Sequence, residues 1–399
     1  MLFSKNPDLS KITCIKDLEK IGRIKVPRMF YDYCNTGSWT QSTYHHNVDD
    51  LQKLKFKQRV AIDMEGRNTR SQLLGQDVSM PLALSPVGLT GMQRADGEIL
   101  AAKAAERFGV PFTLSTMSIC SIEDVAEHTT KPFWFQLYFM RDRSFMADLI
   151  KRAHDAGCST LVVTLDLQVL GQRHRDIKNG LSTPPKPTIR NLLDLALRPE
   201  WCWHMLQTKR RQFGNIVGHV KGVSDMSSLS SWTADQFDPR LSWDDIEWIK
   251  ERWDRKLIIK GIMEPEDAQL AHEHGADAIV VSNHGGRQLD GAPSTIDALP
   301  RIVDLYQKLN SKTEIYMDSG IRTGQDILRA LALGAKGVMI GRAFIYGLQA
   351  YGEAGVYKAL SILQKELETS MAFCGCTEIS QLSTEILHNY KTWIKDKLD

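Results

Sequence analysis

A histidine, a lysine, an aspartate and several arginines stand at the ends of short apolar runs of this chain, where they could form one reactive site. His284 lies in the segment SNHGGR, residues 282–287. An imidazole that is oriented by a carboxylate such as Asp166 can act as a base and is stabilised as a cation. Lys260 ends another run, and a buried ammonium is costly unless it faces an anion. Lys260 therefore fits two functions, a Schiff-base nucleophile or a fixed positive charge.

Glycine and arginine occur together after the last two runs, in SGIR (319–322) and GRA (341–343). Bare backbone amides can approach phosphate oxygens there, and a guanidinium neutralises their charge, so the two segments together predict a phosphate site. Arg287 and Arg173 offer bidentate partners for a substrate carboxylate. No GxGxxG fingerprint opens a βαβ unit, which disfavours a nicotinamide cofactor.

Eight such runs alternate with helical patterns along the chain. Their nearly continuous hydrophobicity is typical of strands that are buried on both faces of a parallel sheet. Eight strands that alternate with helices predict an α/β fold, a (β/α)₈ TIM barrel, which gathers functional residues at the carboxyl ends of its strands. The runs lie at 80–86, 111–116, 132–138, 161–166, 257–261, 278–286, 314–320 and 337–343.

The chain of 399 residues is expected to form one domain, since such barrels can use this length as a single unit. One spacing between runs is much longer than the others, which predicts an insertion after the fourth strand. The expected parts are an N-terminal helical cap (1–79), the barrel (80–166 and 244–345), the insertion (167–243) and C-terminal helices (346–399).

The predicted insertion carries an excess of positive charge. Residues 167–224 hold ten Lys or Arg against three Asp or Glu, while the whole chain has a net charge of +2. Apolar, tryptophan-containing sequence precedes KRRQ (209–212), and basic amphipathic segments bind anionic membrane surfaces. Two functions of the insertion remain possible from the sequence: a membrane contact through 184–212, or a partner-binding segment or active-site lid.

Composition excludes several other classes of protein. A nearly neutral chain has no general attraction for nucleic acid, and no run approaches about 18 apolar residues, the length of a spanning helix. The first thirty residues lack the apolar core of a signal peptide. Seven scattered cysteines indicate reduced thiols, and no metal site is expected.

The segments SNHGGRQLDGAPSTIDALP (282–300) and MDSGIRTGQDILRALALGAKGVMIGRAF (317–344) resemble the FMN-dependent L-2-hydroxyacid dehydrogenase and oxidase family. The resemblance runs almost end to end, and PVGLTGM (86–92) and FQLYFMRDR (135–143) are most similar to its bacterial membrane-associated members that oxidise L-lactate. It implies oxidation of L-lactate, or a close L-2-hydroxyacid, to the 2-oxoacid with FMN as cofactor. Electrons would pass to quinone or another membrane carrier, from a homotetramer on the cytoplasmic side of the plasma membrane.

The resemblance also implies a role for each matched residue. His284 would be the base, Asp166 would stabilise its cation, and Lys260 would face the pyrimidine end of the reduced flavin. The substrate carboxylate would be held by Arg287, Arg173, Tyr33 and Tyr138. FMN would contact Pro86, Val87, Gly88, Ser115, Gln136, Thr164 and Ser282, with Asp318 at the ribityl or phosphate region and Gly320, Arg322, Gly341 and Arg342 at the phosphate.

Two positions depart from many family oxidases. Met117 stands where some carry an active-site tryptophan, and Gly88 stands where many carry alanine, a difference that points toward dehydrogenases. The alternative is a soluble L-2-hydroxyacid oxidase for glycolate, mandelate or lactate that reduces oxygen to hydrogen peroxide. A Schiff-base lyase barrel and an inactive scaffold are two further alternatives.

Overall fold

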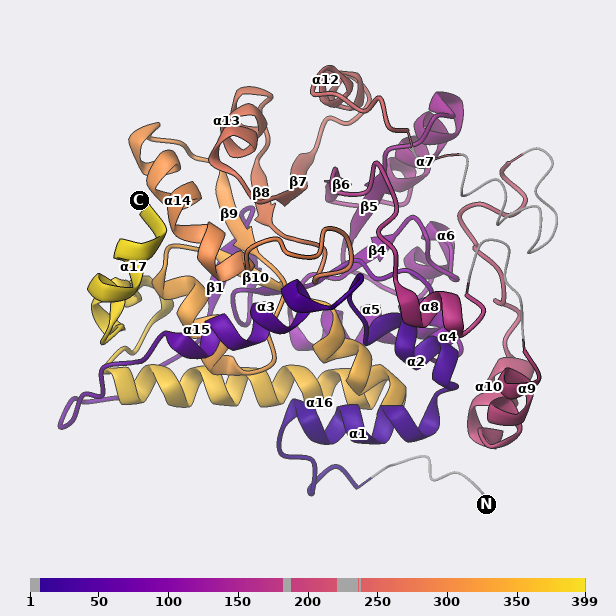
Figure 1. Ribbon diagram of the computed structural model, residues 1–399, viewed down its shortest axis with the longest axis horizontal. Coiled ribbons are helices and arrows are strands. Elements are labelled where there is room, and N and C mark those ends of the chain that lie inside the picture. The colour runs from indigo at the N-terminus through magenta and orange to yellow at the C-terminus, as the bar shows by residue number, and fades with distance from the viewer. Residues whose placement is uncertain (1–7, 182–187, 221–235, 237, 399) are drawn as a thin grey trace.

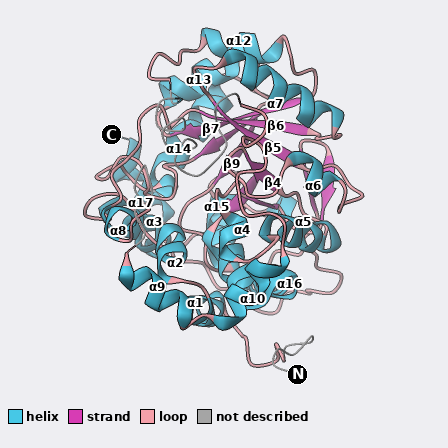
Figure 2. Cartoon of the chain, turned by 90° about the vertical axis from the view of Figure 1, so that its right-hand side faces the viewer, coloured by secondary structure: helices cyan, strands magenta, loops and turns pink. Residues whose placement is uncertain are grey.

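The computed structural model describes residues 8–181, 188–220, 236 and 238–398, and its centre is a barrel of eight parallel strands (Figures 1 and 2). Neighbouring strands are paired in the order β3-β10-β9-β8-β7-β6-β5-β4. A single parallel bridge between Leu84 and Phe112 joins β3 to the segment before β4 and closes the ring. The strands are β3 (Leu82–Leu84), β4 (Thr113–Ser115), β5 (Trp134–Tyr138), β6 (Thr160–Thr164), β7 (Lys256–Ile262), β8 (Ala278–Val281), β9 (Glu314–Met317) and β10 (Gly337–Ile340). The predicted (β/α)₈ barrel is confirmed.

A helix follows each barrel strand and covers the outside of the barrel, as Figure 2 shows. Local chemistry begins these helices: Ser121 and Asp124 form a reciprocal capping box, and so do Thr323 and Asp326. Pro265 occupies the first turn of its helix, where its missing N–H is not needed. The helices are α5 (Gly97–Phe108), α6 (Ile122–Ala126), α7 (Arg143–Asp155), α12 (Asp244–Lys250), α13 (Pro265–Glu273), α14 (Thr295–Lys308), α15 (Gly324–Ala332) and α16 (Arg342–Cys374).

The inside of the barrel is filled with side chains, among them the stacked rings of Trp134 and Tyr316, whose centroids are 6.3 Å apart. Leu73 packs below them from a two-stranded hairpin, β1 (Ser71–Leu73) and β2 (Gln76–Val78). This hairpin differs from the all-helical cap expected for residues 1–79. Its turn residues Leu74 and Gly75 both have positive φ, as a tight hairpin turn requires, but Leu-Gly is a weaker signal than Asn-Gly.

The remaining helices lie outside the ring. The N-terminal cap contributes α1 (Ile15–Lys25), α2 (Arg28–Cys34) and α3 (Ser42–Lys53), and α4 (Thr90–Gln93) lies in the loop after β3. Between β6 and α12 lie α8 (His174–Lys178), α9 (Ile189–Ala196) and α10 (Pro199–Gln207), and Figure 1 places α9 and α10 at the lower right, apart from the strands. After α16, which bends at Tyr351 and Gly352, come 3₁₀ turns at Ile379–Gln381 and Thr384–Ile386 and the last helix, α17 (Tyr390–Leu398).

Candidate active site

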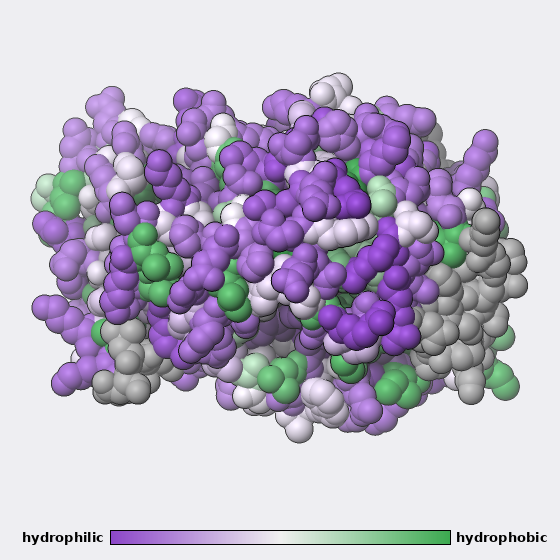
Figure 3. Space-filling view, turned by 90° about the horizontal axis from the view of Figure 1, so that it is seen from above, coloured by the Kyte–Doolittle hydropathy of each residue, from purple (hydrophilic) through white to green (hydrophobic). Residues whose placement is uncertain are grey.

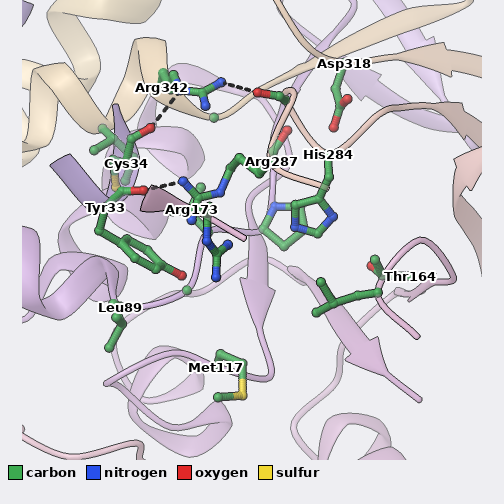
Figure 4. A pocket seen from close by; sticks show the side chains of 18 of the residues that line it. Tyr33, Cys34, Leu89, Met117, Thr164, Arg173, His284, Arg287, Asp318 and Arg342 are labelled. Atoms are coloured by element: carbon green, nitrogen blue, oxygen red, sulfur yellow. Dashed lines mark hydrogen bonds between the residues drawn. The ribbon is translucent and has the colours of Figure 1, made fainter. Parts of the chain in front are cut away.

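A cavity of about 370 Å³ opens at the carboxyl ends of the barrel strands (Figure 4). Its size falls within the range of small-molecule and cofactor sites. Fifteen of the nineteen residues that the sequence predicts for the site line it. Of the other four, Asp166 contacts His284, Ser282 contacts Lys260, and Ser115 contacts both Met117 and Gln136. The fifteen are Tyr33, Pro86, Val87, Gly88, Tyr138, Thr164, Arg173, Lys260, His284, Arg287, Asp318, Gly320, Arg322, Gly341 and Arg342.

His284 forms a close pair with Asp166. Its Nδ1 lies 2.7 Å from Asp166 Oδ1, and Ser282 Oγ accepts a hydrogen bond from its backbone N–H at 3.1 Å. The backbone of His284 has a φ of +57°, a left-handed conformation that costs free energy for a residue with a Cβ. With Nδ1 committed to the carboxylate, Nε2 is the ring nitrogen left to exchange a proton with a molecule in the cavity.

The position of Asp166 depends on a glycine in the next strand. Gly261 has a φ of +107° at the irregular register of β7, and a Cβ there would lie 2.8 Å from Asp166 Cβ. Burial alone would raise the pKa of Asp166, but His284 and Lys260 more than offset it and hold that pKa below its ordinary value. Asp166 is therefore an anion that can stabilise an imidazolium.

This lowered pKa predicts a pH-dependent contribution to stability. A carboxyl whose pKa is lower in the folded state stabilises the protein above its unfolded pKa of about 3.9, and the contribution disappears as pH falls through the folded value. The free energy of unfolding of the wild type should therefore exceed that of Asp166→Asn near pH 5. Urea titrations should show this difference shrinking below about pH 4, and a difference that grows on acidification contradicts the assignment.

Lys260 is buried in β7 and paired with an acid at the end of β9, two strands away in the barrel. Its Nζ lies 2.9 Å from Asp318 Oδ2 and donates to Ser282 Oγ at 2.6 Å. Burial lowers the pKa of Lys260, but Asp318 and Asp166 outweigh burial and raise it. A Schiff-base lysine needs a lowered pKa, so the geometry favours the fixed positive charge. Asp318 has Lys260 and the hydroxyl of Ser319 as its partners within the protein.

Two arginines and two tyrosines form the cationic side of the cavity. Tyr33 packs its ring against the guanidinium groups of Arg287 and Arg173, at 4.7 and 5.9 Å from its centroid. Burial raises the pKa of both Tyr33 and Tyr138, which keeps their hydroxyls as hydrogen-bond donors. The four side chains together can bind a carboxylate by charge and by hydrogen bonds.

Arg342 and Arg322 also line this cavity. Arg342 donates to the carbonyls of Cys34, Gly285 and Thr36, and burial lowers its pKa to about 10, so it stays charged at neutral pH. Gly320 has no room for a side chain, because a Cβ would lie 1.9 Å from a backbone oxygen of α3. Glycine backbone and guanidinium groups thus meet as a phosphate site requires.

Apart from Met117, sequence reasoning missed the apolar wall of the cavity, and it also missed one acid. Asp176 also lines the cavity, 3.0 Å from Arg173 Nε, and its spacing of three residues from Arg173 was the available signal. The apolar residues come from several elements distant in sequence, so no single motif marks them. The wall includes Met29, Phe30, Leu89, Met92, Met117, Ile119, Leu167, Leu170, Leu181 and Phe213.

A histidine–aspartate pair, a buried lysine and a phosphate-type site meet in one barrel cavity, an arrangement that fits an enzyme with a phosphorylated ligand. The profile of FMN-dependent dehydrogenases matches residues 22–389, and the chain belongs to that family. The family expected from the sequence is confirmed.

Named relatives are similar in sequence to this chain over nearly its whole length. The L-lactate dehydrogenases of Ectopseudomonas mendocina and Vibrio cholerae are 43% and 44% identical to it, covering 94% of this chain and 98% and 99% of their own. The crystal structure of the monotopic membrane protein (S)-mandelate dehydrogenase aligns with a TM-score of 0.90 at 35% identity, over 95% of this chain and all of that one. Flavocytochrome b2 aligns with a TM-score of 0.80 at 30% identity, over 96% and 88%.

FMN is the cofactor, as expected, and the side chains fit it. Gln136 Nε2 and Thr164 Oγ1 are buried and have no hydrogen-bond partner among the described residues. Buried polar atoms rarely stay unpaired, and the polar edge of a flavin ring offers partners of both kinds. Arg322, Arg342 and the glycine backbone suit its phosphate. FMN supplies the capacity to accept two electrons when it is bound.

Proposed function

We propose that the protein oxidises L-lactate, or a close L-2-hydroxyacid, to the 2-oxoacid. The His284–Asp166 pair and two arginines in one cavity carry this proposal, since a 2-hydroxyacid presents a carboxylate beside the carbon that is oxidised. The names of the relatives support L-lactate as the substrate.

In the proposed reaction, Arg287 and Arg173 hold the substrate carboxylate, and the hydroxyls of Tyr33 and Tyr138 donate hydrogen bonds. His284 Nε2 accepts a proton from the substrate, and Asp166 stabilises the imidazolium. Lys260 fixes a positive charge beside the ring of FMN. The residues that would contact the ring are Pro86, Val87, Gly88, Ser115, Gln136, Thr164 and Ser282. Those that would hold the ribityl phosphate are Asp318, Gly320, Arg322, Gly341 and Arg342.

An anaerobic absorbance spectrum before and after L-lactate tests the substrate. The yellow flavin band should bleach with L-lactate and not with D-lactate. A band that persists with L-lactate but bleaches with L-mandelate or glycolate would show that the substrate is another 2-hydroxyacid. A protein that stays oxidised with all three contradicts the proposal.

We further propose that electrons leave to quinone or another carrier at the cytoplasmic face of the plasma membrane, from a homotetramer. No helix among the described residues is long and apolar enough to cross a bilayer. Reoxidation of the bleached protein separates the acceptors: a quinone analogue should restore the yellow band quickly. Fast reoxidation by air with hydrogen peroxide would instead indicate the soluble oxidase.

The helices α9 and α10 support a surface contact with the membrane. No residue of α9 is buried, although the helix is rich in apolar side chains. Such exposure is unlike the face of the molecule seen in Figure 3, which is mostly hydrophilic with separate apolar residues. The exposed apolar side chains are Ile189, Leu192, Leu193, Leu197, Trp203 and Leu206, with relative exposures of 53–79%. Arg190 and Lys209 stand near them, as in interfacial amphipathic helices. Residues 184–187 of the predicted 184–212 segment lie outside the described residues.

Charge on this apolar surface should release the protein from membranes. The triple variant Leu192→Asp, Leu193→Asp and Leu197→Asp should lose most co-sedimentation with anionic vesicles and still bleach with L-lactate. Each aspartate removes apolar contact and adds repulsion, which lowers binding by at least about tenfold. Val60→Asp is the control, since Val60 is 77% exposed outside the segment. Equal sedimentation of the triple variant and the control contradicts the assignment.

A further inference from the structure

Asp176 is a buried acid in the active-site cavity for which the reaction above has no role. It lies in the first turn of α8, lines the cavity and is 4% exposed. Its Oδ2 is 3.0 Å from Arg173 Nε, and neither oxygen has a hydrogen bond of good geometry among the described residues. The ion pair with Arg173 connects this acid to the cationic side of the cavity.

The two cavity arginines are held in different ways. Arg287 donates from Nη1 to the backbone carbonyls of Tyr33 and Thr36, so the protein backbone fixes it. Arg173 precedes α8, outside the barrel strands, and its contacts are the Tyr33 ring and the carboxylate of Asp176. Figure 4 shows Arg173 next to Arg287, between Tyr33 and His284. The direction of the Arg173 guanidinium thus depends on Asp176.

The site of the ion pair on Arg173 matters for binding. Asp176 approaches that guanidinium at Nε, and we infer that the two Nη groups are directed to a ligand. A fork of two Nη–H donors matches the two oxygens of a carboxylate. Asp176 also places a negative charge beside two adjacent guanidinium groups that repel one another.

We propose that Asp176 is the positioning residue of Arg173, holding its Nε so that its Nη groups bind the carboxylate of the 2-hydroxyacid. This inference rests on the proposed function, since it takes the substrate carboxylate to lie between Arg173 and Arg287. Burial and Asp32 raise the pKa of Asp176 against the opposing effect of Arg287 and Arg173, so the protein keeps an acid there at a cost.

The holoenzyme variant Asp176→Asn tests the proposal through binding and turnover measured separately. A charge-assisted contact contributes enough that its loss should raise the KM for L-lactate, and the dissociation constant of oxalate, by about tenfold. The kcat should change by less than about threefold, since His284 is untouched. Oxalate binding is followed by the change in flavin absorbance, which needs no turnover. Wild type that binds oxalate but is not bleached by L-lactate refutes the proposed substrate alone.

The sign of the effect separates positioning from charge. A carboxylate that acted only through its charge would repel anions, so Asp176→Asn would tighten oxalate binding, and that result overturns the proposal. Asp176→Glu keeps the charge and displaces the guanidinium, so it should also raise KM. An unchanged KM in Asp176→Glu likewise contradicts positioning.

Two further variants complete the design. Asp50→Asn removes another buried acid with a basic partner three residues away, Lys53, but lies outside the cavity, and it should leave both constants unchanged. In an Arg173→Lys background, Asp176→Asn should add less than about a twofold effect, because the group that it positions is gone. Full additivity of the two substitutions refutes the coupling.

Discussion

His284→Gln should fold, bind FMN and lose nearly all flavin reduction by L-lactate. A positioned base contributes about 10²- to 10⁴-fold to a proton transfer, so we expect a loss near 10³-fold in the anaerobic rate of bleaching. Glutamine suits the test because its amide can still donate to Asp166, which would otherwise be a buried anion without its partner. Stopped-flow absorbance of the flavin band measures the rate directly.

His128→Gln is the matched control for this prediction. His128 is exposed at the end of α6 and contacts a backbone oxygen through Nδ1, so the same substitution there should leave the rate unchanged. Reduction of the His284→Gln protein within a few-fold of wild type would remove His284 from its role. A colourless but folded variant would instead place His284 in cofactor binding.

The barrel could be predicted because its signals are local. Each buried strand needs apolar residues on both faces, and the helices carry their own start signals, such as Ser121 with Asp124. The predicted run 278–286 was longer than β8 because its polar end forms the loop that carries His284. The residues that carry the chemistry could therefore be located at the ends of the apolar sequence segments that predict the strands.

Pairings within the site could not be predicted from the same signals. The barrel indicated that Lys260, Asp166 and Asp318 share one rim, but the close approach of Asp166 to β7 requires a glycine at the irregular register of Gly261. Asp176 was missed for a related reason: it lies in a short helix beyond the barrel, and folding alone brings it to the cavity. The apolar wall combines residues from distant loops, which leave no periodic pattern.

Lys260→Met should change both the stability of the protein and the reduction potential of its flavin, for separate reasons. The substitution leaves Asp318 buried without its partner, which typically costs about 3–5 kcal/mol in the free energy of unfolding. It also removes the positive charge that we propose stabilises negative charge on the reduced ring. A loss of about 1.4 kcal/mol shifts a two-electron potential by about 30 mV, so we expect a potential lower by tens of millivolts.

The double variant Lys260→Met with Asp318→Asn separates these two effects. Removing the unpaired carboxylate should recover most of the lost free energy of unfolding, since replacing both partners of a buried pair is often nearly neutral. It should not return the potential to the wild-type value, because the positive charge that we propose faces the flavin is still missing. Redox titration against a dye and urea denaturation measure the two quantities on the same preparations. A potential that returns to the wild-type value in the double variant would show that Lys260 serves only to neutralise Asp318, and the fixed charge at the flavin would have to come from another residue.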